Sequence, residues 1–413
     1  MSGFISRIKV YHVNHGIWYT LKKIAYKFIE VILTIGMVPI VILLRFIKPF
    51  IHIRFGSVRS DMIGHFVFDT EYYLSLKEIN NNKTLDLFYY SQKLIPNSQW
   101  LIMVNREITI HPLVKIADKA NHLIPGWEKY YADMNKSSGR DIRNVLSITK
   151  PHIQFTKEEL KRGHKYLQKC GLKPSDKFVC VICRDPTYKN EYMNQKGKDW
   201  NYHSYRNSDI SNYEKTIDTL ANKGFYIFRM GKGVSKNIDE SHSRVIDYAN
   251  SKDRSDFLDI YLFANNYYSV LSEAGIITVA NAYRKPHCFV NLAAIEYAQT
   301  WNSNSLTIFK KYWDLNKKRF MTFKEIYASG SGKFLFTEQY DELGIELIEN
   351  TPDEILDVSM ELHHRLNNTW ETTEEDEVLQ KMFWDFFPKS ELHGKIHIRI
   401  GADFLRQNRE LLN

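Results

Sequence analysis

Short apolar runs alternate with amphipathic stretches through much of the second half of the chain. The runs predict strands and the amphipathic stretches predict helices. Strands and helices in strict alternation are typical of an α/β fold with a doubly wound parallel sheet. The predicted strands span 177–183, 225–230, 268–271 and 287–291, and the predicted helices span 211–223, 255–265 and 276–283.

The part of the chain before this region has a less regular pattern. Strands are predicted at 50–55, 85–90 and 100–104, and a helix at 65–76. The first strand is expected to break at Gly56, and a glycine-bounded turn then leads to Gly64 and the helix, so Asp61 or His65 could face a cleft. The capping box from Thr156 to Glu159 begins a further helix. At 413 residues the chain should contain more than one domain, and we divide it into 1–50, 51–155, 156–345 and 346–413.

The first 50 residues differ from the rest in composition. Val31–Leu44 is an uncharged apolar run with Lys and Arg on both sides, too short for a membrane span and interrupted by Gly36 and Pro39. No cleavage site of small residues follows it. We therefore predict an in-plane or re-entrant helical anchor, with aromatic residues at the interface and cations facing anionic lipid. A buried helix hairpin that packs on the body of the protein is the alternative.

The net charge of +8 is unevenly distributed along the chain. Residues 1–50 carry +6, 338–377 carry −13 and 378–413 carry +2, which leaves +13 on 51–337. This excess of positive charge suits an anionic ligand and a membrane surface. Nucleic acid is not expected as a partner, because the sequence has no basic run with interleaved aromatic residues and no RNA-binding signature.

The four cysteines do not suggest a disulfide framework or a metal site. Cys180 and Cys183 have CxxC spacing, but they lie inside an apolar run. A redox pair should open a helix, and a zinc pair needs a second pair elsewhere. The sequence therefore predicts that both belong to a core strand.

The polar loop between the first two strands of the regular region carries the first candidate site. It contains His203, Arg206, Asn207 and Asp209, and the strand after the following helix ends at Arg229, with Gly231 beyond it. Arginines and free backbone N–H groups at strand ends are the donors that an anionic ligand such as a phosphate or a nucleotide sugar needs. In the alternative interpretation, the loop residues simply pair with Asp199 or Asp209.

A second candidate is the turn Ser272-Glu273-Ala274-Gly275 between a strand and a helix. It offers a hydroxyl, backbone N–H groups and, in Glu273, a carboxylate for ribose hydroxyls. The sequence contains no Asp-x-Asp, P-loop, GxGxxG, GxSxG or HExxH motif. We therefore expect no metal and no cofactor, with phosphate charge met by Arg, Lys and helix N-termini.

Four segments together resemble a group of bacterial surface-polysaccharide glycosyltransferases. They are Gly64–Leu74, the His-x-x-Arg-Asn-Ser-Asp loop at 203–209, Arg229–Gly231 and Arg399–Leu405. The resemblance runs from about residue 51 to the C-terminus and implies a GT-B architecture. In it, two Rossmann-like domains face each other, the first binding the acceptor and the second the nucleotide sugar, without a catalytic metal. The sequence departs from the family at Glu273, where a small polar residue is expected.

These observations lead to one functional prediction with two alternatives. The prediction is a membrane-associated glycosyltransferase on the cytoplasmic face that moves a sugar from a nucleotide sugar to a lipid-linked glycan. Arg206 and Arg229 would neutralise the leaving diphosphate, and Gly231 and the Ser272–Gly275 turn would contribute N–H groups. His65 or Asp61 would act as general base if the reaction inverts configuration. The alternatives are a nucleotide-sugar epimerase and a non-catalytic scaffold of a polysaccharide assembly complex.

Overall fold

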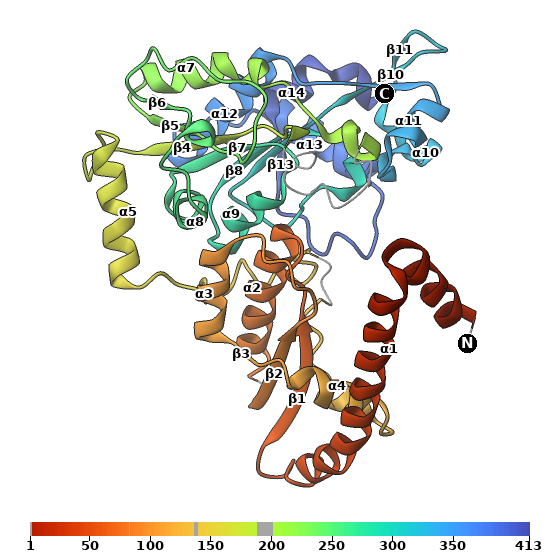
Figure 1. Ribbon diagram of the computed structural model, residues 1–413. Coiled ribbons are helices and arrows are strands. Elements are labelled where there is room, and N and C mark those ends of the chain that lie inside the picture. The colour runs from red at the N-terminus through yellow and green to blue at the C-terminus, as the bar shows by residue number, and fades with distance from the viewer. Residues whose placement is uncertain (1, 82, 136–138, 188–200) are drawn as a thin grey trace. The chain divides into compact units, whose positions relative to one another are not determined.

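The computed structural model describes residues 2–81, 83–135, 139–187 and 201–413, and the chain forms two compact units (Figure 1). Unit 1 consists of Met1–Asp61, Asn80–Leu94 and Val104–Lys136. Unit 2 consists of Met62–Ile79, Ile95–Met103 and Ser137–Asn413. Neither unit is one continuous stretch of the chain. The four-part division made from the sequence stays a prediction.

Unit 1 is built on a small parallel sheet with the order β1-β2-β3, formed by β1 (His52–Val58), β2 (Thr84–Tyr90) and β3 (Thr109–Ile110). The predicted break at Gly56 is wrong, since β1 continues to Val58. A side chain at Gly56 would lie 2.2 Å from the carbonyl oxygen of Ala132. The glycine therefore allows another backbone segment to approach the strand closely.

The long helix α1 (Ser2–Phe46) precedes this sheet and packs against α4 (Val114–His122). The apolar core formed by α1, β1 and α4 contains Val41 of α1 together with Ile53 and Phe55 of β1. The expected interruption at Gly36 and Pro39 does not occur, because Pro39 lies inside the helix. A proline removes one backbone hydrogen bond, and the packing of α1 against α4 outweighs that loss. Ile17–Phe46 is long and apolar enough to cross a membrane by length and composition.

Unit 2 is organised around a seven-stranded sheet in which every neighbouring pair is parallel (Figure 1). The strand order is β13-β9-β8-β7-β4-β5-β6. The chain winds outward from β4 through β5 to β6, then returns beside β4 with β7 and winds the other way. This is a doubly wound α/β arrangement, and all four strands predicted in this region are confirmed. The strands are β4 (Phe178–Ile182), β5 (Tyr226–Arg229), β6 (Val245–Ile246), β7 (Tyr268–Leu271), β8 (His287–Leu292), β9 (Leu306–Phe309) and β13 (Arg399–Ile400).

The central position of β4 explains its composition. Every residue of Phe178–Ile182 is buried, as expected for a parallel strand covered on both faces. Cys180 lies in this strand and Cys183 just after it, and both are buried free thiols, so the predicted core strand is confirmed. Helices cover both faces of the sheet, with α7 (Glu214–Asn222) and α12 (Pro352–Leu366) on one side and α8 (Asp256–Asn265) and α9 (Thr278–Ala282) on the other (Figure 1).

The remaining regular elements complete unit 2. A separate antiparallel sheet has the order β11-β10-β12. The capping box predicted at Thr156 is confirmed, with Glu159 as its partner. The other elements are α5 (Lys157–Lys169), α10 (Phe323–Ser329), α11 (Thr337–Glu342), α13 (Glu374–Phe386), α14 (Ala402–Gln407), β10 (Lys311–Asp314), β11 (Arg319–Phe320) and β12 (Ile345–Ile348).

The predicted strand at 100–104 is wrong, because these residues lie in helix α3 (Ser98–Glu107). The backbone N–H of Trp100 donates to the side chain of Asn97, which caps the helix (2.9 Å). A short apolar run has no clear hydrophobic periodicity, so it does not distinguish a strand from a helix. The capping residue Asn97 before the run is the signal that indicates a helix.

Helix α2 (Ile63–Ile79) is tied to unit 2 by a buried carboxylate. Glu71 is 1% exposed and accepts from Arg284 Nη1 (2.9 Å) and from the ring of His152 (3.0 Å). The other ring nitrogen of His152 lies 2.8 Å from Glu78. These contacts place two carboxylates of α2 against two basic side chains from later parts of the chain.

Replacement of Gly163 by alanine should destabilise unit 2 by about 1–3 kcal/mol, in spite of the better helix propensity of alanine. Gly163 lies in α5 where the helix crosses Tyr261 of α8, and an added Cβ would lie 2.1 Å from the tyrosine ring. Urea unfolding measures the change. Gly36→Ala is the control, because an added Cβ there meets nothing within 4 Å. Equal effects of the two substitutions would contradict this packing.

The free energy of unfolding should fall as pH rises through neutrality, in part because of His152. Hydrogen bonds to Glu71 raise the pKa of His152, against a smaller effect of burial. A raised folded-state pKa adds stability below the unfolded-state value of about 6.5, and this stability is lost as pH rises through the folded value. His152→Gln should flatten the profile measured by urea unfolding from about pH 5.5 to 8.5. The exposed His164→Gln should leave it unchanged.

Candidate active site

The candidate site lies at the carboxyl ends of β4 and β7 in unit 2. These strands are neighbours in the sheet, although β5 and β6 come between them in the chain. The winding direction reverses between them, and such a switch point is where open α/β sheets bind ligands. Arg184 follows β4, and Glu273 follows β7.

Arg184 joins the two strand ends. Its backbone N–H donates to Ser272 Oγ (2.7 Å), and its Nη1 donates to the carbonyl oxygen of Glu273 (2.9 Å). Ser272 is fully buried, so its hydroxyl supports the turn. Ala274 continues the turn, with its N–H donating to the carbonyl oxygen of Ser272 (2.7 Å).

Arg206 approaches the same glutamate from the 203–209 loop. Its Nε lies 3.1 Å from Glu273 Oε1, and its Nη2 lies 3.5 Å from the Glu273 carbonyl oxygen. The Nε atom is buried, yet it has no hydrogen-bond partner among the described residues, since the angle to Glu273 is unfavourable. The side chain keeps 26% of its surface exposed. Arg206 is therefore anchored but incompletely satisfied.

Two guanidinium groups thus meet at Glu273, Arg206 beside its carboxylate and Arg184 on its main-chain carbonyl oxygen. Burial above all, together with the neighbouring charge of Arg206, lowers the pKa of Arg184 to about 10, although Glu273 acts in the opposite direction. Holding two like charges together away from water is unfavourable unless anions compensate. One carboxylate leaves an excess positive charge, which suits a second, external anion.

The rest of the predicted loop is held by the protein itself. Lys310, 5% exposed, donates to the carbonyl oxygen of Asn207 (2.6 Å), and burial lowers its pKa. His203 Nδ1 contacts the carbonyl oxygen of Leu335 (3.1 Å). Asp209 pairs with Lys236 (2.6 Å). In the described part of the loop, the carboxylate beside Arg206 is therefore Glu273, whereas Asp199 lies outside the described residues.

The end of β5 differs from the expectation for Arg229 and Gly231. Arg229 is 1% exposed and pairs with the buried Asp247 (3.1 Å). Its guanidinium is thus engaged within the fold. Gly231 has φ +155°, and its carbonyl oxygen accepts from Arg254 Nε (3.2 Å).

The start of α2 packs against the turn that carries Glu273. A side chain at Gly64 would lie 3.5 Å from Cα of Gly275, so the two backbones are nearly in contact. The neighbouring residue, His65, is partly exposed, with Nδ1 3.1 Å from Asp69 Oδ2. Asp69 is buried, and its other oxygen accepts from the N–H of Gly139 (3.0 Å). Unit 2 therefore brings His65 close in space to the Glu273 turn.

Asp61 is the last of the site residues predicted from the sequence. Asp61 belongs to unit 1, where it pairs with Arg59 (3.0 Å). Arg184 and Asp69 were not among the site residues predicted from the sequence. Asp69 stands four residues after His65 on a predicted helix, a spacing that places both on one face. Arg184 is the first charged residue after a buried parallel strand, which is also a usable signal.

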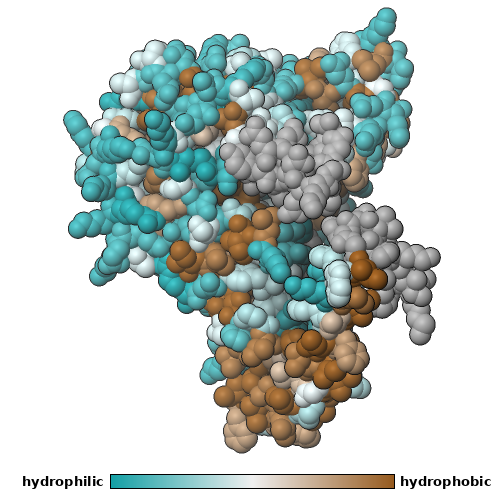
Figure 2. All heavy atoms as spheres, viewed as in Figure 1, coloured by the Kyte–Doolittle hydropathy of each residue, from teal (hydrophilic) through white to brown (hydrophobic). Residues whose placement is uncertain are grey.

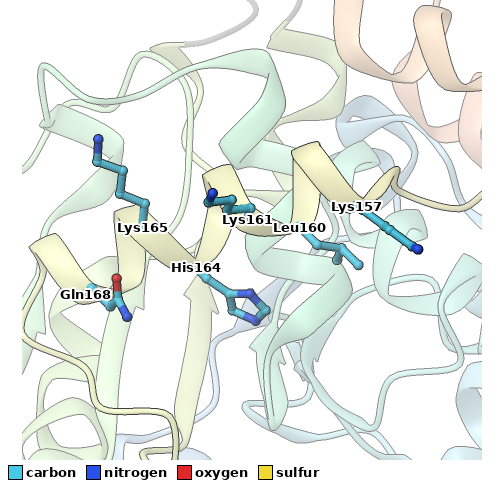
Figure 3. A pocket seen from close by; sticks show the side chains of 6 residues that line it. All are labelled: Lys157, Leu160, Lys161, His164, Lys165 and Gln168. Atoms are coloured by element: carbon cyan, nitrogen blue, oxygen red, sulfur yellow. The ribbon is translucent and has the colours of Figure 1, made fainter.

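Potential metal ligands and a surface hollow were also considered as features of a functional site. In the described part of the chain, no group of three or more His, Cys, Asp or Glu side chains could hold a metal ion. A surface hollow of about 600 Å³ lies along one face of α5 and contains none of the site residues (Figure 3). It is lined by Lys157, Leu160, Lys161, His164, Lys165 and Gln168.

Comparisons with known proteins give matches among solved structures. No protein-family model and no curated protein matches the sequence. A glycosyl transferase family 9 protein from Veillonella parvula aligns over 76% of this chain and 97% of its own, with TM-score 0.41 and 10% identity. E. coli ADP-heptose lps heptosyltransferase II aligns over 62% and 90%, with TM-score 0.37 and 10% identity.

E. coli heptosyltransferase WaaC with ADP aligns over 62% of this chain and 91% of its own, with TM-score 0.34 and 10% identity. All three are glycosyltransferases. At these identities and TM-scores the likeness carries no inference about chemistry, which must come from the side chains described above.

Proposed function

We propose that this protein is a metal-independent glycosyltransferase that transfers a sugar from a nucleotide-sugar donor to a surface glycan. The observation that carries the proposal is the pairing of Arg184 and Arg206 around Glu273 at the switch point of the parallel sheet. Two arginines around a single carboxylate supply the positive charge that a diphosphate requires. The GT-B arrangement implied by the sequence resemblance is part of this proposal.

The two arginines would act on the leaving group. As the bond between the anomeric carbon and the diphosphate oxygen breaks, the electron pair moves onto that oxygen. Fixed positive charge in a partly buried site stabilises this developing negative charge. The Arg206 side chain keeps 26% of its surface exposed, and this exposed part of the guanidinium would contact a phosphate oxygen. Glu273 would accept hydrogen bonds from hydroxyls of the ribose or the sugar.

His65 is the proposed general base, with Asp69 as the residue that positions it. If Nδ1–H donates to Asp69, then Nε2 carries the lone pair and can take a proton. The oxygen of the acceptor would bond to the anomeric carbon while its proton passes to Nε2. A base in this role favours inversion of configuration. Asp61 is not assigned a role.

The acceptor is proposed to be lipid-linked, at the cytoplasmic face of the membrane. The support is the apolar and cationic helix α1 in the same chain, since an anchored enzyme meets a membrane-bound acceptor at high local concentration.

Removal of either arginine should weaken donor binding by about 10- to 100-fold, because the complex loses a charge-assisted hydrogen bond of about that strength. A thermal-shift screen of UDP, GDP, ADP, TDP, CMP and their sugars measures this, because a ligand at a hundredfold excess over Kd adds about 2.7 kcal/mol of stability. At the same ligand concentration Arg184→Ala and Arg206→Ala should reduce this stabilisation to about 0.4–1.4 kcal/mol, and the exposed Arg143→Ala should keep it in full. Turnover should survive EDTA.

No shift with any nucleotide would instead favour the non-catalytic scaffold. Conversion of a nucleotide sugar without an acceptor would favour the epimerase.

His65→Gln should lower kcat by about 10²- to 10⁴-fold, the usual contribution of a general base, and leave nucleotide affinity unchanged. Asp69→Asn should reduce kcat less, because the ring loses the carboxylate that positions it. Transfer assays across pH, combined with the thermal shift, separate catalysis from binding. Full kcat in His65→Gln would exclude the residue as base.

A further inference from the structure

We propose that α1 lies along the surface of an anionic lipid bilayer, with α4 on its protein side, and does not cross the membrane. This proposal makes the membrane location given in the proposed function more specific. It is tested by lipid binding without substrate, so its failure would not decide the glycosyltransferase function, and failure of that function would not decide the position of α1. It rests on which faces of α1 are covered in unit 1 and on the charges that cover them.

The uncovered faces of α1 carry large apolar side chains. Trp18 is 83% exposed, Phe46 75% and Phe50, in the loop after the helix, 89%. The apolar side chains of unit 1 gather around the end of α1 and this loop (Figure 2). Exposed apolar residues of this size and number are typical of a surface that meets lipid. Others are Ile17, Leu21, Tyr26, Phe28, Ile29, Ile32, Leu33, Ile35, Ile40, Leu43, Ile47 and Ile51.

Ion pairs near the middle of α1 hold its covered face against α4. Glu30 is nearly buried and contacts Lys119 of α4, with Lys27 at 3.0 Å and Lys115 at 3.7 Å. Lys119 above all, together with Lys27, lowers the pKa of Glu30 to about 2. The carboxylate is therefore ionised at neutral pH and ties α1 to α4.

A second contact joins the end of α1 to the end of α4. Arg45 donates to the carbonyl oxygens of Asn121 (3.1 Å) and Pro125 (2.9 Å), and its guanidinium stacks over the ring of Tyr130 (4.4 Å). A cation at this position satisfies carbonyl groups at a helix C-terminus. Between the two contacts, Val41 packs on Val114, Ala117 and Ala120.

These contacts are incompatible with a helix that crosses the bilayer. Glu30 lies near the centre of Ile17–Phe46, so a crossing helix would carry Glu30 and its lysines into the hydrocarbon core. The polar helix α4 would follow. Charges and unpaired backbone groups are strongly unfavourable there. An in-plane helix keeps α4 in water and places only the uncovered face in lipid.

The cations beside the apolar face specify the lipid. Lys22, Lys23 and Lys48 are exposed, and each lysine near an anionic surface adds attraction that falls with salt. Trp18 and Tyr26 have the amphipathic rings that suit the interface between headgroups and acyl chains. The chemistry therefore fits an anionic bilayer rather than a purely apolar protein partner.

The first experiment is flotation of the full chain with vesicles of phosphatidylcholine, with and without 30% phosphatidylglycerol, at two salt concentrations. Binding should require the anionic lipid and weaken with salt. Phe46→Glu and Phe50→Glu should each abolish flotation, and Ile148→Glu, at an equally exposed apolar residue of unit 2, should not. Lys22→Ser with Lys23→Ser should weaken binding about tenfold or more. Absence of binding, or self-association without binding, would overturn the proposal.

The second experiment separates the in-plane helix from a crossing one. Lys22→Cys and Lys48→Cys, at exposed positions that an in-plane helix keeps in contact with water, are made one at a time in a Cys170→Ser background, since Cys180, Cys183 and Cys288 are buried. A membrane-impermeant maleimide is then applied to spheroplasts and to inverted vesicles. An in-plane helix gives labelling of both positions from the cytoplasmic side only. Labelling from opposite sides would show that α1 crosses and would overturn the proposal.

Discussion

The pairing of β4 with β7 is the interaction on which the candidate site depends. It brings together two strand ends that are some ninety residues apart in the chain, and it reverses the winding of the sheet between them. Arg184 and Glu273 meet only because of this pairing. Buried parallel strands are rigid, so the charged residues that follow them are held in fixed positions.

The electrostatic balance of the site follows from that geometry. Glu273 holds two arginines close to each other, and a residue without charge at this position would leave their repulsion uncompensated. The sequence resemblance leads to the expectation of a small polar residue here. In the proposed site, the carboxylate of Glu273 would hold Arg206 and its main-chain carbonyl would hold Arg184 before a ligand arrives. An incoming anion then meets donors that are already oriented.

The sequence predicts the second half of the fold well, because buried strands, helix caps and left-handed glycines are local signals. Gly224, for example, has the positive φ (+95°) expected after the helix at 211–223. Predictions failed where the signal was ambiguous, as for Trp100–Val104, or where tertiary packing outweighed a local break, as at Pro39. Arg206, Glu273 and His65 could be predicted as candidates. The buried partner of Arg229 and the role of Arg184 depend on contacts between distant segments, which one sequence does not reveal.

The division of the chain into interleaved units affects how this protein could be recombined. Helix α2 comes from the segment between two strands of unit 1, yet it belongs to unit 2 and brings His65 and Glu71 with it. A gene fragment that encodes only 137–413 would keep the whole seven-stranded sheet. It would nevertheless leave Arg284 and His152 without their carboxylate and lack the proposed base. A chimera that exchanges the front of the chain would therefore change the proposed catalytic machinery as well as the anchor.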